Sequence, residues 1–354
     1  MKVAIIACYD QRDYVRARTL RAAFTAAPDV QVLNIRNRYG GLLRYLEVTL
    51  KITVARWRDK PDAYVITFRG YEMLLFMVMT LVRKPIIFDE MVNFTEWMDE
   101  HHRLKKGTLP YRLFRRWYGR LAKHSRLILA DTEAHARYSA ELNRLDISRY
   151  RVIPVGTDET VFYPRKVKKP EDQPFTVFYY GHMLPLHGLP YVLEAAEMLK
   201  GQGISFRFVG GKTKVKNACA AAARNGARVT HENWLPFDKL PEAALRASLT
   251  MGGPFGDTLQ SRFVITGKTY QFLALGAPAM VGRNEVNSAF QDKVNALVVP
   301  QGDARAIADA ILWAYRHPTE VTKIGAQGRE LYQKEYSQKV INDLVAGLVK
   351  DLVV

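Results

Sequence analysis

The chain alternates short apolar runs with longer stretches of helical periodicity. The runs are rich in Val and Ile and lack strict polar alternation, which is typical of parallel strands covered on both faces. In the first half they are residues 2–8, 30–35, 63–68, 85–90, 127–132 and 151–156. In the second half they are residues 175–181, 205–211, 227–234, 249–253, 277–282 and 296–300. Because the intervals are long enough for crossover helices, the pattern predicts two doubly wound α/β sheets in tandem.

A charged, proline-bearing segment at residues 165–174 is the best candidate for a linker. It predicts a first domain over residues 1–165 and a second over 166–335. Residues 336–354 read as a final amphipathic helix that packs toward the first domain. Open α/β sheets bind ligands beyond the carboxyl ends of their strands, so two such domains facing each other would enclose a central cleft.

Charge changes this picture more than composition does. Lys and Arg number 52 against 35 Asp and Glu, which gives a net charge of +17. Such a surface attracts polyanions, namely nucleic acid, anionic lipid or phosphorylated substrates, although solubility alone is a simpler explanation. No nucleic-acid-binding module is recognisable, so we do not expect a nucleic-acid partner. Two cysteines and no visible signal peptide make a cytoplasmic location the expectation.

Several common motifs are missing from the sequence. It contains no G-x-x-x-x-G-K-[ST] loop, and no G-x-G-x-x-G follows the first apolar run. This argues against a P-loop ATPase and a nicotinamide dehydrogenase. The sequence also lacks H-E-x-x-H, C-x-x-C and D-x-D, so it predicts no metal site and no cofactor.

The segment YYGHMLPLHGLPYVLEAA, residues 179–196, reads as a strand end, a loop held between Gly181 and Gly188, and a helix. Such a turn favours anion binding, because the first N–H groups of the helix are free and its dipole is positive at that end. The loop carries His182 and His187 in place of Lys or Arg. Both can donate hydrogen bonds to a phosphate, or they are ordinary loop histidines.

This loop and several other segments together resemble one known family. They are, in chain order, YVRARTLRAAF (14–24), VIPVGTDETVFYP (152–164), GHMLPLHG (181–188), GKTYQFLALGAPAM (267–280) and NALVVPQGDARAIADAI (295–311). Their order and spacing are similar to those of the retaining glycosyltransferases of family four, the glycosyl transferases group 1, which have the GT-B fold. The resemblance implies a nucleotide-sugar donor in the second domain, an acceptor in the first, retention of configuration and no need for a metal.

The chain departs from the family pattern at the donor site. The two glutamates of the family's E-x7-E pair correspond to Phe263 and Gln271, of which Gln271 can still bond a ribose diol. His182 and His187 stand where the family has basic residues in its diphosphate loop. The resemblance therefore implies that Lys268 and Arg262 supply the fixed positive charge instead. The remaining donor contacts that it implies are Thr269, Trp234 and Leu235. Ordinary explanations remain open: Lys268 as a solvated lysine, Gln271 as a surface glutamine and Trp234 as a core tryptophan.

On the acceptor side, Asp89 and Glu90 stand at the end of a predicted strand. Asp89 would be a catalytic carboxylate and Glu90 an acceptor contact, since a carboxylate there could orient the acceptor hydroxyl or act as its base. A carboxylate that caps the next helix is the alternative. Tyr14, Arg16 and Arg18 are the other candidates for acceptor contacts, or else surface residues of a helix start.

Residues 101–126 contain nine Lys or Arg and no acid. On a helix over residues 111–123, Leu113, Phe114, Trp117, Tyr118 and Leu121 fall on one face. The opposite face carries the candidate membrane-binding residues Arg112, Arg115, Arg116, Arg120 and Lys123. A basic amphipathic helix of this kind is typical of membrane interfaces, but a core-packed helix with a basic outer face fits equally well.

We therefore expect a glycosyltransferase of glycan biosynthesis with a lipid-linked or glycan acceptor, peripheral on the inner face of the cell membrane. The alternative is a non-catalytic GT-B relative that binds a sugar nucleotide or a lipid, because Phe263 cannot replace a glutamate.

Overall fold

The computed structural model describes residues 1–9, 14–68, 70–100, 103–168, 170 and 172–353. The chain divides into two compact units. The first contains residues 1–155 and 341–354, and the second contains residues 156–340. The segment between residues 156 and 165 therefore clusters with the second unit, whereas the sequence pattern placed it in the first domain.

The first unit is built on a six-stranded parallel sheet of order β2-β1-β3-β4-β5-β6. Its strands are β1 Lys2–Ala7, β2 Gln31–Arg36, β3 Ala63–Ile66, β4 Ile86–Asp89, β5 Leu127–Ala130 and β6 Tyr150–Val152. Every residue of β3, β4 and β5 is buried, which explains why the apolar runs show no polar alternation.

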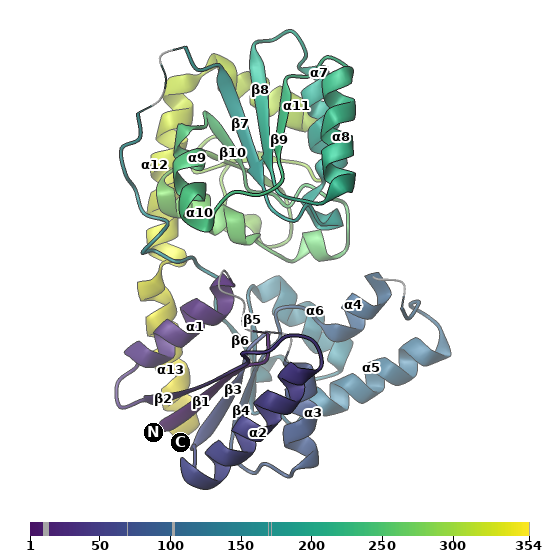
Figure 1. Cartoon of the computed structure of the whole chain (residues 1–354), viewed down its shortest axis with the longest axis vertical. Helices are drawn as coiled ribbons and strands as arrows, with labels where there is room; N and C mark the ends of the chain where they lie inside the picture. The colour runs from purple at the N-terminus through teal and green to yellow at the C-terminus, as the bar shows by residue number, and fades with distance from the viewer. Residues whose placement is uncertain (10–13, 69, 101–102, 169, 171, 354) are drawn as a thin grey trace. The chain divides into compact units, whose positions relative to one another are not determined.

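Helices cover both faces of this sheet (Figure 1). They are α1 Val15–Ala26, α2 Leu43–Arg58, α3 Tyr71–Met79, α4 Phe94–Glu100, α5 Leu109–Ala122, α6 Glu133–Asn143, the short η1 Ile147–Arg149 and the final α13 Gln338–Val353. Helices α1 and α13 share one hydrophobic core on one face. Helices α2, α3, α5 and α6 pack over a second core on the other face.

The second unit has its own six-stranded parallel sheet, of order β12-β11-β10-β7-β8-β9. The strands are β7 Phe175–Tyr180, β8 Ile204–Val209, β9 Val229–Glu232, β10 Leu249–Met251, β11 Ala279–Gly282 and β12 Leu297–Val299. The helices are α7 Leu189–Met198, α8 Thr213–Arg224, α9 Leu240–Arg246, α10 Gly267–Leu275, α11 Ala304–Arg316 and α12 Pro318–Glu335. Four single turns complete it, η2 Pro185–His187, η3 Phe237–Lys239, η4 Gln260–Arg262 and η5 Asn287–Ala289. The predicted class of two doubly wound sheets is confirmed.

The strand order fixes where each unit should bind a ligand. The first connections from β7 run toward β8 and β9, and the later ones run the opposite way from β10. The loops after β7 and β10 therefore lie at the point where the direction of winding reverses. Open α/β sheets bind ligands at such a point. Gly181–Gly188 follows β7, and Lys268 lies on the helix that follows β10.

The contribution of α13 to the first unit can be tested. Ile341 is fully buried in the core that α13 shares with α1, so Ile341→Ala should lower the free energy of unfolding by about 2–5 kcal/mol. Leu344→Ala on the same helix is the control, because that side chain is 42% exposed. Urea unfolding followed by circular dichroism measures both. Equal midpoints for the two variants would contradict the packing of α13.

Candidate functional site

Two loops of the second unit interlock through their glycines. Gly188 has φ +68°, and a Cβ on it would lie 2.4 Å from the backbone carbon of Phe255. A Cβ on Gly256 would likewise lie 2.4 Å from the carbonyl oxygen of Pro185. The N–H of Gly256 donates to the carbonyl of Leu186 at 2.9 Å. The loop after β7 is therefore held by backbone contact to the loop after β10, and side chains larger than hydrogen do not fit at these two positions.

Lys268 reaches the loop from the first turn of α10. A Cβ placed on Gly181 would lie 3.7 Å from Cε of Lys268 and 3.7 Å from Cε1 of His187. The Lys268 ammonium also lies 5.0 Å from the centre of the Tyr179 ring. The structure thus brings Gly181, His187, Gly188 and Lys268 together, at the start of α7 and α10. Neither helix has a side-chain cap on its first turn, so N–H groups at both helix starts remain available to an anion.

The charge of Lys268 is unusually costly to hold. Its side chain is buried, and within the described residues it forms no ion pair. Burial lowers the pKa of the Lys268 ammonium from 10.5 to about 7. A lysine in this state gains a full charge when an anion arrives beside it, because the anion favours the protonated form. The alternative of a solvated lysine at a helix start does not fit these facts.

His187 is held as a neutral hydrogen-bond donor. Its Nδ1 accepts the N–H of Leu184 at 3.2 Å, so a proton on this ring belongs on Nε2. Burial lowers the pKa of His187 well below 6.5, and the charges of Lys268 and His182 lower it further. His187 can therefore donate one hydrogen bond near Gly181 without carrying charge. His182 lies exposed in the same loop.

The other predicted donor residues are placed unequally. Gln271 and Thr269 are buried in α10, and Thr269 Oγ1 lies 3.1 Å from Thr266 Oγ1. Trp234 follows β9 and is 72% exposed, so it is not a core tryptophan, and Leu235 beside it is half-buried. Arg262 is exposed and ion-paired with Glu285. Arg262 thus has a carboxylate partner at the surface, and its joint role with Lys268 stays a prediction.

In the first unit, Arg16 and Asp89 form a buried ion pair. Arg16 Nε and Nη2 donate to Asp89 Oδ1 at 3.0 and 2.8 Å. Arg16 Nη1 also donates to the carbonyls of Ile153 and Pro154. Burial opposes the charge on Arg16, but Asp89 raises the pKa of the guanidinium above its ordinary value. Arg16 therefore ties α1 to β4 and to the end of β6, and it is not an exposed acceptor contact. Asp89 is 1% exposed and burial raises the pKa of its carboxyl, although Arg16 opposes that rise. Its role as a catalytic carboxylate stays a prediction.

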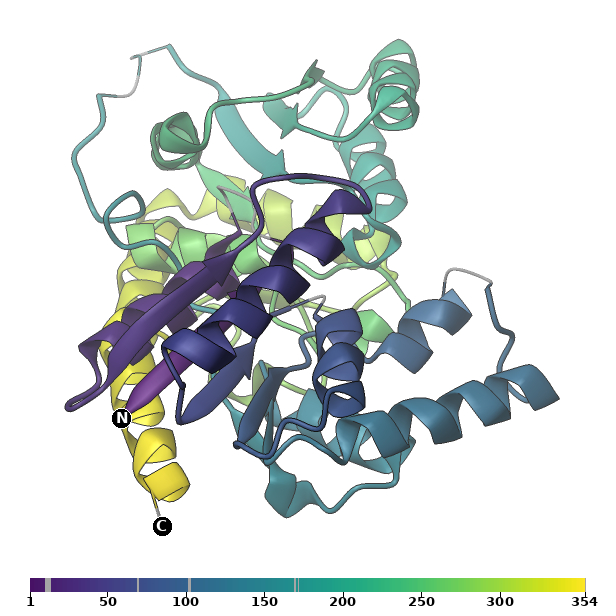
Figure 2. The same cartoon turned by 60° about the horizontal axis from the view of Figure 1, so that its bottom comes forward.

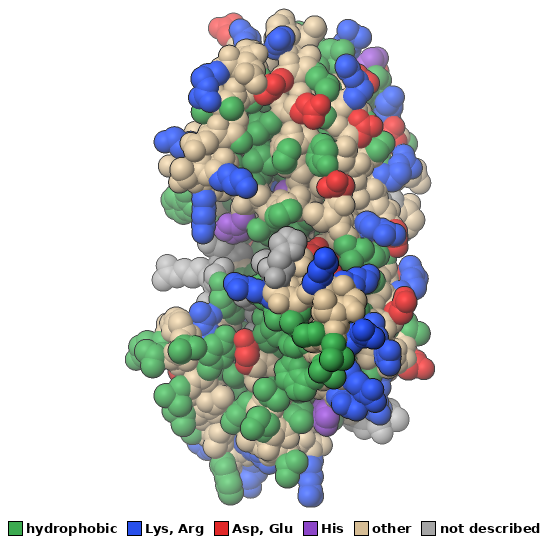
Figure 3. Space-filling view, turned by 90° about the vertical axis from the view of Figure 1, so that its right-hand side faces the viewer, with side chains coloured by type: hydrophobic (Ala, Val, Ile, Leu, Met, Phe, Trp, Pro, Cys, Tyr) green, Lys and Arg blue, Asp and Glu red, His purple; other side chains and the backbone are tan. Residues whose placement is uncertain are grey.

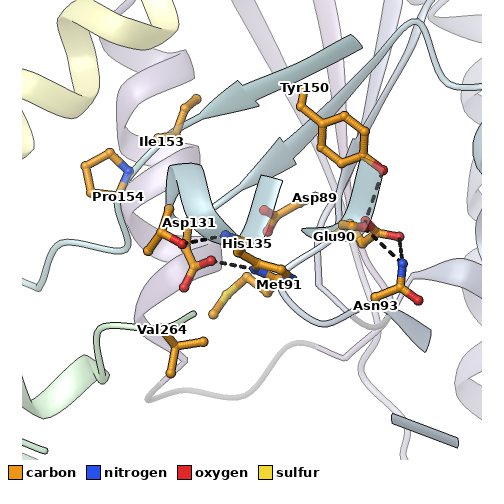
Figure 4. Close-up of polar contacts among 12 residues, drawn as sticks. Asp89, Glu90, Met91, Asn93, Asp131, His135, Tyr150, Ile153, Pro154 and Val264 are labelled. Atoms are coloured by element: carbon orange, nitrogen blue, oxygen red, sulfur yellow. Dashed lines mark hydrogen bonds and ion pairs between the residues drawn. The ribbon is translucent and has the colours of Figure 1, made fainter. Parts of the chain in front are cut away.

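Glu90 lies in a buried polar network. Its carboxylate accepts hydrogen bonds from Tyr118 at 2.7 Å, from Asn143 at 3.1 Å, from Asn93 at 3.3 Å and from Ser139. Figure 4 shows Glu90, directly after β4, beside Asn93 and beside Tyr150 at the start of β6. Glu90 is 2% exposed, so these bonds crosslink α5 and α6 to β4 and leave no free oxygen for an acceptor. The expectation that Glu90 contacts the acceptor is corrected accordingly.

A second buried pair was missed by the sequence reading. Asp131 follows β5, and its Oδ1 lies 2.7 Å from Nδ1 of His135 one helical turn later (Figure 4). Burial opposes the imidazolium, yet Asp131, together with Glu96 and Glu90, raises the pKa of His135 to about 9. Glu96 has no hydrogen-bond partner for its Oε1 within the described residues, and burial raises its pKa to about 7. The i, i+4 spacing of Asp131 and His135 was the available signal.

Of the remaining acceptor candidates, Tyr14 is half-buried. Its hydroxyl lies 2.9 Å from the sulfur of Met91, and its ring stacks on Phe68 with 5.1 Å between centroids. Arg18 is exposed on α1. Tyr14 and Arg18 are thus the two acceptor candidates that retain some accessible surface.

Helix α5 only partly matches the predicted membrane helix. Tyr118 and Leu121 are buried in the core, and Phe114 packs against it. Leu113 and Trp117, from the same predicted apolar face, are 60% and 42% exposed. Of the basic residues, Arg112, Arg116, Arg120 and Lys123 are exposed and Arg115 is half-buried. Within the described part of the chain, no helix is long and apolar enough to cross a membrane, and no three His, Cys, Asp or Glu side chains gather as a metal site would require.

Solved structures share this fold. HepE of Anabaena, in complex with UDP-glucose, superposes with a TM-score of 0.75 at 13% identity, over 99% of this chain and 100% of that one. Sucrose-phosphate synthase of Thermosynechococcus elongatus gives a TM-score of 0.77 at 14% identity, over 100% and 99%. The fold is therefore GT-B, as predicted.

Sequence comparison identifies the family of the second unit. Residues 174–317 match the family described as Glycosyl transferases group 1. WcaL of Escherichia coli (strain K12), named as a colanic acid biosynthesis glycosyltransferase, is 26% identical over 214 residues, which are 56% of this chain and 50% of WcaL. The chain thus spans about half the length of this curated relative. The second unit is thus similar to the group 1 glycosyltransferases, in agreement with the resemblance of its motifs.

The ion pair of Arg16 leads to a prediction about stability. Arg16→Met leaves Asp89 buried and unpaired, so it should lower the free energy of unfolding by about 3–5 kcal/mol. Adding Asp89→Leu should restore most of the loss, because the stranded charge is then gone. Arg18→Met, on the exposed side of α1, is the control. If Arg16→Met unfolds like the parent protein in urea, the pair does not hold the unit together.

Lys268 leads to a prediction with a definite pH dependence. Its pKa is about 7 folded and 10.5 unfolded, so the unfolded chain binds more protons between these values and stability rises with pH across them. Below pH 7 the buried charge lowers the free energy of unfolding by its full amount. At about 1.4 kcal/mol per pKa unit, the upper limit of this loss is about 5 kcal/mol.

Lys268→Met should therefore raise the free energy of unfolding at pH 6, and the gain should shrink toward pH 10. Exposed Lys212→Met provides the matched control. Urea midpoints at several pH values test this. A Lys268→Met protein that is less stable than the parent at pH 6 would show that the ammonium has a partner.

Proposed function

We propose that the protein transfers a sugar from a nucleotide-sugar donor to an acceptor hydroxyl. In this reaction the bond between the anomeric carbon and the diphosphate breaks, and the acceptor oxygen takes its place as it loses its proton. The diphosphate leaves with more negative charge than it had in the donor, so the protein must stabilise that charge. The group 1 domain and the UDP-glucose bound by HepE support a donor of this class.

One observation carries the proposal, namely the buried and unpaired Lys268 beside the glycine loop. A buried lysine without an acid destabilises a protein, so a chain that needed only stability would place an apolar side chain there. At this position the ammonium of Lys268 and the neutral imidazole of His187 lie near Gly181, and α7 begins directly after Gly188 without a side-chain cap. We assign the departing diphosphate to this site, with Lys268 as the ammonium whose charge the anion favours and His187 as a neutral donor.

The surrounding residues take the remaining donor contacts. Trp234 offers an exposed ring at the end of β9 on which a nucleobase can stack, with Leu235 beside it. Gln271 and Thr269 lie on α10 with Lys268 and would face the ribose. We infer retention of configuration from the family alone, and the proposal involves no metal or cofactor.

We further propose that the acceptor is lipid-linked or a glycan at the inner face of the cell membrane. The exposed arginines of α5 and the net charge of +17 support attraction to an anionic surface. Tyr14 and Arg18 are the proposed acceptor contacts, because both side chains keep surface that an acceptor could reach. A binding protein without transferase activity is the alternative, because buried Phe263 stands where the family has a glutamate.

The kinetic test separates these two functions. With a panel of nucleotide sugars that includes UDP-glucose, the protein should release nucleoside diphosphate in the presence of acceptor. Lys268→Met should lower kcat/KM by about 100-fold or more, the scale of one electrostatic donor at a transition state. The exposed Lys212→Met variant should retain full turnover. If the protein binds donors tightly but neither transfers nor hydrolyses them, the binding-only function holds.

A further inference from the structure

Helix α2 exposes an unusual stripe of large apolar side chains. Its inner face, Val48, Ile52 and Ala55, is buried against the sheet. Its outer face carries the apolar stripe, which consists of Leu43, Leu46, Leu50, Val54 and Trp57, between 53% and 79% exposed. The steps between these residues are three, four, four and three, so they form one line along the helix. With a rise of about 1.5 Å per residue, this line is about 21 Å long.

The stripe continues past the end of the helix. Arg56 donates to the carbonyl of Thr80 at 2.8 Å, which holds the end of α2 against the end of α3. Met79 and Leu81 beside it are 73% and 76% exposed. At the start of the helix, Tyr39 and Leu42 are 61% and 84% exposed. Scattered exposed apolar side chains are ordinary, but a continuous line of this kind marks a contact surface.

Basic residues flank the apolar stripe. Arg56, Arg58, Lys60, Arg83 and Lys84 are all exposed around its Trp57 end. The nearest acids are already engaged. Asp59 is paired with Arg58, and Glu47 bonds Lys51 and the backbone N–H groups of Arg38 and Tyr39. The surface is therefore apolar along its middle and positive at its edge.

Helix α5 extends the positive charge on the same side of the sheet. Helices α2, α3 and α5 cover one face of the first unit, as Figure 2 shows from below. Hydrophobic side chains gather over this unit among lysines and arginines in Figure 3. Leu113 and Trp117 of α5 add exposed apolar surface next to its arginines.

We infer that α2 lies flat in the headgroup region of an anionic bilayer, with its apolar stripe among the acyl chains and its basic edge on lipid phosphates. Charge complementarity selects this occupant. A second copy of the chain would offer another apolar stripe but no acidic surface for the basic residues at the Trp57 end, whereas an anionic bilayer matches both features. The inference deepens the proposed location of the acceptor, but the docking itself does not depend on sugar transfer.

Vesicle binding of the full chain tests the inference. The stripe variant Leu46→Gln, Leu50→Gln and Trp57→Gln replaces exposed side chains and should leave the fold intact. We expect its affinity for vesicles of phosphatidylcholine and phosphatidylglycerol to fall about tenfold or more. The free energy of insertion grows with the apolar area that the bilayer buries, and this variant removes much of that area. The matched control Ile147→Gln, Met198→Gln and Val294→Gln changes three exposed apolar residues elsewhere and should bind as the parent does.

A second readout separates insertion from electrostatic attraction. Trp57 should be quenched by phosphatidylglycerol vesicles with brominated acyl chains, and Trp57→Phe should remove that quenching. Replacement of Arg112, Arg115, Arg116, Arg120 and Lys123 by glutamine should reduce affinity and salt dependence but leave the quenching of bound protein unchanged.

The following outcomes would overturn the inference. One is a stripe variant that binds vesicles as tightly as the parent, and another is an unquenched Trp57. A dimer in sedimentation equilibrium that the stripe variant dissociates, with vesicle binding unchanged, would make a second copy the occupant. UDP binding by the second unit should be the same in every variant. If docking holds while no nucleotide sugar is turned over, only the proposed function fails.

Discussion

The candidate donor site depends on one constraint, which is that Lys268 must be held in a buried position with no carboxylate partner among the residues that the structure describes. The interlocked glycines of the loops after β7 and β10 provide the rigid backbone that makes this possible. They hold the loop after β7 against the loop after β10, and Lys268 and His187 lie together near Gly181. The low pKa of Lys268 follows from this burial, and so does its capacity to respond to an anion. The buried ammonium lowers the stability of the fold, and the proposed binding of a diphosphate explains why the chain keeps a lysine there.

The first unit uses buried charge in the opposite way. Arg16 pairs with Asp89, and the carboxylate of Glu90 accepts hydrogen bonds from hydroxyl and amide donors. These networks fasten helices to the carboxyl ends of the strands, near where an acceptor would bind. Arg16, Asp89 and Glu90, which the sequence offered for the acceptor side, are therefore buried structural contacts, whereas Tyr14 and Arg18 keep accessible surface. The apolar stripe of α2 adds a different specialisation on the helical face of the same unit.

The fold was predictable because its signal is local and repeated. Twelve Val- and Ile-rich runs each became a parallel strand, since strands covered on both faces need continuous apolar sequence. The motif around Gly181 and Lys268 was also recognisable, and the group 1 match supports it. The partners of charged side chains were not predictable. Asp89 and Arg16 lie 73 residues apart, and Arg262 and Glu285 lie 23 apart. Periodicity likewise assigned one apolar face to α5 but could not show that Tyr118 is buried while Trp117 is exposed.

The most direct test of the central claim is the proton balance of nucleotide binding. Calorimetric titration with UDP at pH 8, in two buffers of different ionisation enthalpy, gives the number of protons taken up per site. Lys268 is largely neutral there when free, and a diphosphate beside it should restore its charge. The account predicts an uptake of about one proton for the parent protein and almost none for Lys268→Met. Binding of UDP without proton uptake, or an uptake that persists in Lys268→Met, would contradict it.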